Sequence, residues 1–203
     1  RGVMGHRDKN MQELTEKFIV SRRPKEFLKQ GLMHCGAYSV KAVLEAYDKA
    51  DKKNPEDYHL SWWRRISGLT SARTWQKVLR NYGLRAEVGC VRVLSSTERL
   101  HFLKELLLKD APVMVRTGNG YLPNGKYNPV LGRIIGHWIT VWGYDDRRQV
   151  FYVYDSAVAP RLYDKDISTG NKQRSYKEVL RDWRGGLFPW PFFPRPFQEY
   201  KRS

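Results

Sequence analysis

Apolar residues recur with helical spacing at two places in the first half of the chain, and each pattern predicts a helix. The first helix begins at Cys35, and its apolar face consists of Val40, Val43, Leu44 and Tyr47. The second lies within "LTSARTWQKVLRNYGL", residues 69–84, and its apolar face consists of Trp75, Val78, Leu79 and Tyr82. Gly83 follows that face directly and supplies the stop.

Later segments alternate between strand patterns and helix starts. "LRAEVGCVRV", residues 84–93, alternates like a strand and predicts that Cys90 is a buried packing residue. "APVMVRTG", residues 111–118, is typical of a buried strand, and "MQELTEKFIV", residues 11–20, favours a short helix. The chain therefore has the pattern of one α+β domain, with helices first and strands concentrated later.

Two serines mark further helix starts, because each stands three residues before a glutamate in a capping box. Ser95 with Glu98 opens one helix, and Ser175 with Glu178 opens a helix that runs to Trp183. The Gly-Gly pair at 185–186 then serves as its stop, a simpler interpretation than self-cleavage after those glycines. "SWWRR", residues 61–65, is expected to place at least one tryptophan in the core or in a substrate cleft.

The segment "GHWITVWGYDDRRQVFYVYDSA", residues 136–157, predicts an antiparallel hairpin, since two alternating runs flank a turn-like "DDRR". A register that pairs Val141 with Phe151, and Ile139 with Val153, keeps both faces chemically consistent. That register places His137 directly opposite Asp155 at the end of an apolar sheet face.

Cys35 is open to three interpretations: a packing residue, a metal ligand or a nucleophile. A thiol at a helix N-terminus has a lowered pKa, and an imidazole with a carboxylate behind it suits a general base. Gln30 could supply an amide donor beside the backbone N–H of Cys35, which would form an oxyanion hole. Neither metal-ligand spacing nor a cofactor motif accompanies these residues, so the sequence predicts no metal and no cofactor.

The motifs "QGLMHCGAYSVKAVL", "GHWITVWGYD" and "YVYDSA" resemble those of papain-like cysteine peptidases. The resemblance is greatest to double-glycine peptidases that process bacteriocin leaders, and it extends from about residue 28 to 186. It implies Cys35 as nucleophile, His137 as base, Asp155 as orienting carboxylate and Gln30 as oxyanion donor. These families usually place the glutamine six residues before the cysteine, whereas here Lys29 occupies that position and Gln30 lies five before.

Length and composition agree with a single globular domain: 203 residues, of which 41% are hydrophobic. We expect a polar extension over 1–24, the peptidase domain over 25–186 and a Pro/Phe-rich tail over 187–203. No apolar run approaches the ~18 residues of a membrane span. The formal net charge of +16 favours an acidic partner, but the basic residues are scattered and form no nucleic-acid motif, so a generally basic surface is preferred to nucleic-acid binding.

The expected activity is that of a cysteine endopeptidase that cuts a protein or peptide after small residues, Gly-Gly in particular. Two alternatives use the same residues: transglutaminase-like acyl transfer, and a papain-like binding module that has lost catalysis. The bacterial setting that we expect is secretion or delivery into a target cell rather than residence in the cytoplasm, since the chain has no export signal, no initiating Met and only two cysteines. A toxic effector of this kind would need an acidic immunity protein to cover Cys35 and His137.

Overall fold

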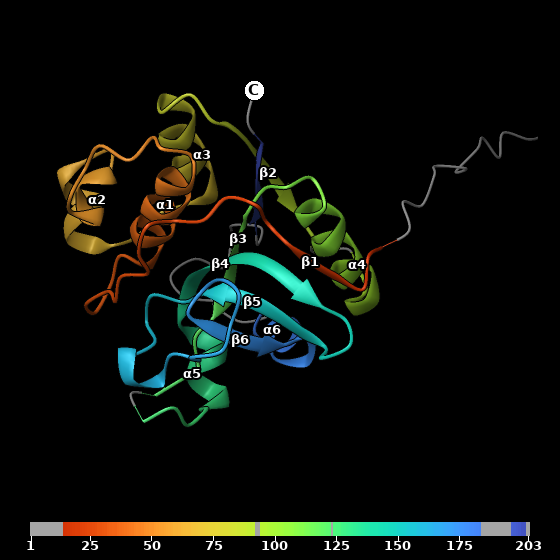
Figure 1. Cartoon of the computed structure of the whole chain (residues 1–203). Coiled ribbons are helices and arrows are strands. Elements are labelled where there is room, and N and C mark those ends of the chain that lie inside the picture. The colour runs from red at the N-terminus through yellow and green to blue at the C-terminus, as the bar shows by residue number, and fades with distance from the viewer. Residues whose placement is uncertain (1–13, 92–93, 123, 184–195, 202–203) are drawn as a thin grey trace, which may run out of the picture.

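An antiparallel sheet of seven strands forms the middle of the structure (Figure 1). The structure is a computed structural model, and it describes residues 14–91, 94–122, 124–183 and 196–201. Six strands follow the order β2-β7-β3-β4-β5-β6, and β1 pairs with β4. The strands are β1 (Lys17–Ile19), β2 (Arg85–Cys90), β3 (Val113–Gly118), β4 (Gly136–Asp145), β5 (Val150–Tyr154), β6 (Lys172–Ser175) and β7 (Pro196–Lys201). The helices are α1 (Cys35–Ala46), α2 (Trp62–Ser67), α3 (Ala72–Asn81), α4 (Ser96–Leu107), α5 (Pro129–Ile134) and α6 (Tyr176–Asp182), with 3-10 helices η1 (Pro55–Tyr58) and η2 (Pro160–Leu162). This arrangement confirms the predicted α+β class.

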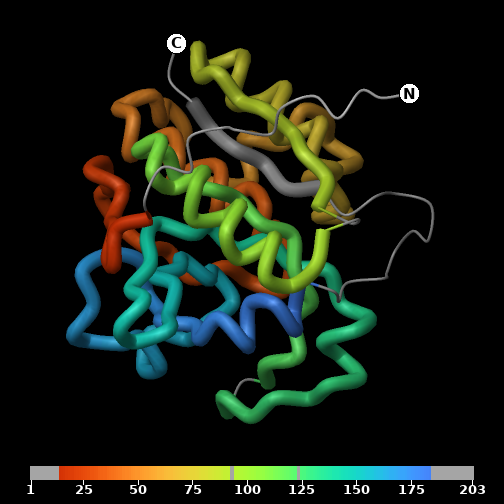
Figure 2. Tube along the Cα trace, turned by 90° about the vertical axis from the view of Figure 1, so that its right-hand side faces the viewer, coloured from red at the N-terminus to blue at the C-terminus, as the bar shows by residue number. Residues whose placement is uncertain are grey.

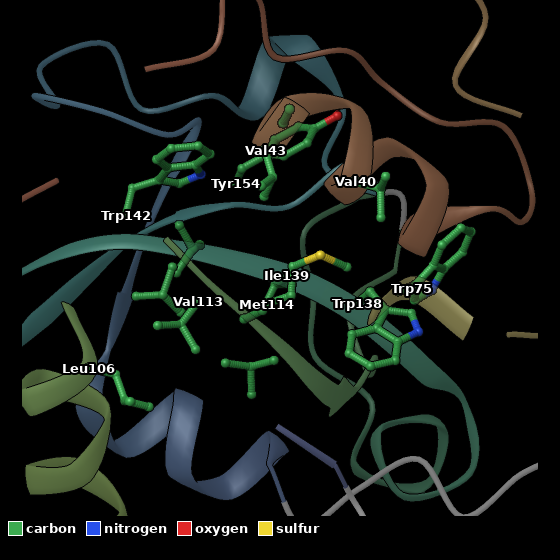
Figure 3. Packing of buried hydrophobic residues seen from close by; sticks show 14 of the residues in the cluster. Val40, Val43, Trp75, Leu106, Val113, Met114, Trp138, Ile139, Trp142 and Tyr154 are labelled. Carbon is green, nitrogen blue, oxygen red and sulfur yellow. The ribbon is translucent and has the colours of Figure 1, made fainter. Parts of the chain in front are cut away.

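Helices pack on both faces of the sheet. α1 contacts β4 and α3, and Figure 3 shows Val40 and Val43 of α1 on the same side of the sheet as Trp142 and Tyr154. α4 and α6 contact each other and also β3, and Leu106 of α4 lies on the opposite side of the sheet from α1 (Figure 3). Figure 2, turned by 90°, shows α4 in light green crossing in front of the strands. All of the named side chains are buried, so the sheet is the boundary between two apolar layers.

Local signals place the helices where the sequence predicted them. α1 begins at Cys35 and α3 ends just before Gly83, whose φ of 75° is the left-handed conformation that glycine adopts without strain. Ser95 and Ser175 both form capping boxes, with Glu98 and Glu178 respectively, so both predicted helix starts are confirmed.

Two local predictions are wrong. Lys17–Ile19 is the strand β1, which pairs with the second half of β4, and not part of a helix. Pairing with a distant strand outweighs the weak helical pattern of such a short segment. Cys90 is exposed rather than buried, because it is the last residue of β2, and the next residue, Val91, is the one that enters the core.

The β4–β5 hairpin forms, but its register differs from the prediction. Val141 pairs with Val153 and not with Phe151, a shift of two residues from the prediction. A bulge between Val141 and Gly143 adds a further shift of one residue, so that Tyr144 pairs with Phe151. The turn is as long as "DDRR" but lies one residue later: Asp145 still pairs with Val150, so the turn consists of residues 146–149. Its last residue, Gln149, has a φ of 54°, and the Asp145 carboxylate accepts a hydrogen bond from the Arg148 N–H at 3.0 Å. Near the start of β4 the difference from the predicted register is two residues, so each side chain still lies on its predicted face.

Close packing beneath the start of α1 makes Gly36 a sensitive position. A β-carbon at Gly36 would lie 2.2 Å from Nε1 of the fully buried Trp75. Overpacking costs about 1–3 kcal/mol, and a contact this short should cost an amount at the upper end, which exceeds the roughly 1 kcal/mol that alanine gains over glycine within a helix. We expect Gly36→Ala to lower the free energy of unfolding in urea by about 1 kcal/mol or more. Gly31→Ala is the matched control, because nothing lies within 4 Å of its β-carbon position; equal stability of the two variants would contradict this packing.

Candidate active site

Cys35 is the first residue of α1, and two backbone N–H groups surround its sulfur. The pairing of β4 with β5 ends at Thr140 and Tyr154, and the N–H of Trp138 donates instead to Sγ of Cys35 at 3.3 Å. The N–H of Gly36 acts on the thiol from the first turn of α1. The sulfur therefore lies where the N-terminus of a helix meets the start of a central strand: the helix contributes the positive end of its dipole, and the strand contributes the Trp138 N–H.

The pKa of Cys35 is below the ordinary value for a thiol. Burial raises this pKa, but the charge and hydrogen bond of the His137 imidazole, together with the N–H groups of Trp138 and Gly36, lower it by more. A lowered pKa favours the thiolate, which is the nucleophilic form of cysteine. These contacts favour the nucleophile among the three interpretations of Cys35.

His137 and Asp155 form a buried hydrogen-bonded pair. Nε2 of His137 lies 2.7 Å from Oδ1 of Asp155, and each side chain is 5% exposed. Because Nε2 contacts the carboxylate, Nδ1 is the ring nitrogen left for the sulfur of Cys35. Burial alone would lower the pKa of His137. The charges of Asp155 and Cys35 raise it by a larger amount, so the net pKa is about 10. In the observed register His137 and Asp155 are not directly opposite each other but diagonal neighbours across the hairpin. Their side chains are long enough to bridge that spacing.

Asp155 has more partners than the sequence predicted. Its Oδ1 also accepts the N–H of Ala157 at 3.0 Å, and its Oδ2 accepts Nη2 of Arg174 at 2.9 Å. Asn171 binds both the backbone N–H and the carbonyl of Asp155, at 2.8 and 2.9 Å. Sequence reasoning missed Arg174 and Asn171, because neither belongs to a motif and both reach Asp155 only through the pairing of β5 with β6.

Gln30 is buried beside this group, whereas Lys29 is exposed. The backbone N–H of Gln30 donates to the carbonyl of Ser156 at 2.9 Å, and its side-chain Oε1 accepts the Ser156 hydroxyl. Ser156 follows Asp155 directly, so the loop after β5 fixes both side chains. Since Oε1 is the acceptor, Nε2 of Gln30 is the atom that remains to donate. Burial and bonding therefore distinguish Gln30 from Lys29, despite its unusual spacing from Cys35.

A histidine pair and exposed apolar side chains adjoin the nucleophile. Nδ1 of His34 lies 3.1 Å from Nε2 of His59. The backbone of His34 has a φ of 77°, in the left-handed region. Trp62 and Trp63 of α2 are 71% and 61% exposed, so neither lies in the core, and a place for one of them in a substrate cleft stays a prediction. A β-carbon at Gly68, just after α2, would contact the Cβ of Met33, which places this end of α2 against the residues before Cys35.

Within the described part of the chain, no group of three or more His, Cys, Asp or Glu side chains is arranged to hold a metal ion. Among the same residues, no helix combines the length and the apolar character that crossing a membrane requires.

Comparison with known proteins decides the family. The Peptidase C39 like family matches residues 24–181, which is most of the chain. The chain belongs to the Peptidase C39 like family. It is accordingly a cysteine peptidase, and the resemblance found in the sequence is confirmed. No curated protein matches it significantly.

Two solved structures share the papain-like fold of this C39-like chain. A double glycine motif protease from an AMS/PCAT transporter, in complex with the leader peptide, has a TM-score of 0.51 at 19% identity, covering 92% of this chain and 99% of that one. Xylellain, a cysteine protease from Xylella fastidiosa, has a TM-score of 0.58 at 15% identity, covering 94% of this chain and 87% of that one.

The lowered pKa of Cys35 leads to a direct prediction about its reactivity. At mildly acidic pH, iodoacetamide should modify Cys35 faster than Cys90, although Cys90 is the more exposed of the two. His137→Ala should slow the modification of Cys35 by about tenfold or more, since each unit of pKa changes the thiolate fraction tenfold. Mass spectrometry of the two cysteine peptides over time measures both rates in one sample. Equal rates at Cys35 and Cys90 would mean that the site does not activate the thiol.

Proposed function

We propose that the protein is an endopeptidase in which Cys35, His137 and Asp155 form the catalytic triad. The observation that carries the proposal is the buried chain of contacts from Cys35 through His137 to Asp155. In a family of cysteine peptidases, this group has the geometry and the charges that peptide-bond cleavage needs.

The reaction follows from these positions. The thiolate of Cys35 attacks the peptide carbonyl carbon, and negative charge develops on the carbonyl oxygen. This oxygen accepts hydrogen bonds from the Cys35 N–H and from Nε2 of Gln30. His137 gives its proton to the leaving amine, which releases the first product and leaves a thioester on Cys35. His137 then takes a proton from water as the water attacks the thioester, so the carbon–sulfur bond breaks, the carboxylic acid is released, and the thiolate of Cys35 and the imidazolium of His137 are restored.

The preferred substrate that we propose is a polypeptide with Gly-Gly before the scissile bond. Two observations support it: the motifs resemble those of double-glycine peptidases, and a structural neighbour is a double glycine motif protease solved with a leader peptide. Exposed apolar side chains in the segment before Cys35 and in or just after α2, whose end contacts that segment, favour a polypeptide over a small molecule, since exposed apolar surface is typical of sites that bind other chains. These side chains are Leu32, Met33, Trp62, Trp63, Ile66 and Leu69.

Cleavage of a matched pair of peptides tests this function. The native protein should cut a peptide that contains Gly-Gly, and should cut the same peptide with Val-Val in its place much more slowly. Cys35→Ala should abolish cutting, because deletion of a hydrolase nucleophile costs about 10⁶ in kcat. Mass spectrometry of the products gives the cut position, and added primary amine reveals acyl transfer as a conjugate. Equal cutting by the native protein and by Cys35→Ala would overturn the proposal.

Gln30→Ala separates the oxyanion role from the activation of the thiol. Loss of an oxyanion donor lowers kcat by about 10²–10³. Gln30 is not among the groups that lower the pKa of Cys35, so the alkylation rate of Cys35 should stay at the native value. Cleavage at the native rate would remove Gln30 from the mechanism.

A further inference from the structure

Arg174 offsets the negative charge of the buried carboxylate of Asp155. With Cys35 as thiolate, His137 as imidazolium and Asp155 as carboxylate, three ionised groups carry a net charge of −1 in a region shielded from water. An uncompensated buried charge is costly, and proteins usually pair it or neutralise it by protonation. The guanidinium of Arg174, 2.9 Å from Oδ2 of Asp155, is the cation that contacts this carboxylate and brings the sum of these four groups to zero. Arg116 of β3 adds a further positive charge that interacts with Cys35.

We propose that Arg174 is a positioning residue of this peptidase: it fixes the Asp155 carboxylate toward His137 and sets the pH range in which the Cys35–His137 pair is charged. This inference rests on the proposed function. Arg174 acts through Asp155, because Oδ1 and Oδ2 of that carboxylate bind His137 and Arg174 respectively. With a charged partner on each oxygen, rotation of the carboxylate would break both bonds.

The surroundings of Arg174 hold it rigidly. Arg174 and Asp155 side chains are 8% and 5% exposed, so this is a buried ion pair and not a solvated surface contact. The guanidinium stacks on the ring of Tyr121, with 3.7 Å between its carbon and the ring centroid. The Tyr121 hydroxyl donates to Oε1 of Glu178 at 2.8 Å, and Glu178 is itself held in the capping box of α6. The site is thereby connected to α6 and to the loop after β3.

Other charged and titratable groups around this ion pair do not change charge near neutral pH. Burial raises the pKa values of Tyr121, Tyr154 and Tyr163, and hydrogen bonds from Ser175 and Tyr121 bring the pKa of Glu178 below its ordinary value despite burial. Arg181 donates to Asp182 and to the Tyr121 hydroxyl, and Tyr127 also donates to Asp182. Arg116, whose charge interacts with Cys35, also stays protonated near neutral pH. The groups of the proposed triad whose ionisation responds to Arg174 in this range are therefore Cys35 and His137.

The sign of the effect follows from the charge. Removing a positive charge destabilises the thiolate, which raises the pKa of Cys35, and stabilises the imidazolium, which raises the pKa of His137. The acid limb of activity depends on forming the thiolate, and the alkaline limb on keeping the imidazolium. Both limbs should therefore move to higher pH when Arg174 is replaced by a neutral residue.

The test compares pH profiles of kcat and kcat/KM on a Gly-Gly peptide for three variants. Arg174→Met should move both limbs upward by on the order of one pH unit and lower kcat, with KM little changed because Arg174 is buried. Arg174→Lys keeps the charge, so its limbs should stay in place while kcat falls, since a lysine cannot reproduce the planar guanidinium contacts. Arg181→Met is the matched control: it removes a neighbouring arginine that contacts Tyr121 but not Asp155, and its limbs should stay at the native pH.

Several outcomes would overturn the proposal. A uniform loss of kcat in Arg174→Met, with unmoved limbs, would assign Arg174 a merely structural role. Upward shifts of the same size in Arg174→Lys or in Arg181→Met would show that the charge beside Asp155 is not the cause. If Arg174→Met does not fold, Arg174→Gln takes its place, because it removes the charge but keeps an amide donor for Oδ2 of Asp155, and both of its limbs should move upward. The pH dependence of Cys35 alkylation, measured without any substrate, keeps failure of this inference distinct from failure of the proposed cleavage.

Discussion

The buried carboxylate of Asp155 is the constraint that organises this protein. A carboxylate that is only 5% exposed must receive hydrogen bonds or opposite charge, or it would take up a proton. It receives hydrogen bonds from the ring of His137, the N–H of Ala157 and the guanidinium of Arg174. These partners bring its pKa well below its ordinary range, although burial alone would raise it. A permanently charged Asp155 in turn favours the charged form of His137, and that form favours the thiolate of Cys35.

Ordinary packing brings the two halves of this group together. α1 contacts β4 through a buried apolar face, and this contact fixes the helix N-terminus beside the first residues of the strand. At that point β5 has already ended its pairing, so the N–H of Trp138 is available to the sulfur of Cys35. The loop after β5 then fixes Gln30 through Ser156. The geometry of this group of side chains depends on where a sheet pairing ends, as much as on the identity of the side chains.

Much of this could be predicted from sequence, because the signals are local. Apolar spacing and capping boxes specify α1, α3, α4 and α6, and the order of the three motifs pointed to Cys35, His137 and Asp155. The hairpin register could not be predicted, because the two-residue shift before the bulge keeps each side chain on its predicted face, and alternation along the strands does not specify the bulge between Val141 and Gly143. Arg174 and the strand β1 were missed for a related reason: each is defined by a partner far away in the sequence.

The central claim is that Asp155 and Cys35 together hold His137 as an imidazolium. Nuclear magnetic resonance of ¹⁵N-labelled histidine side chains measures the protonation of the ring directly. Near neutral pH, the native protein should show both ring nitrogens of His137 protonated, because the raised pKa of about 10 lies well above that pH. Cys35→Ala should titrate at lower pH, since the thiolate is one of the charges that raise this pKa. A neutral His137 ring near neutral pH in the native protein would contradict the account.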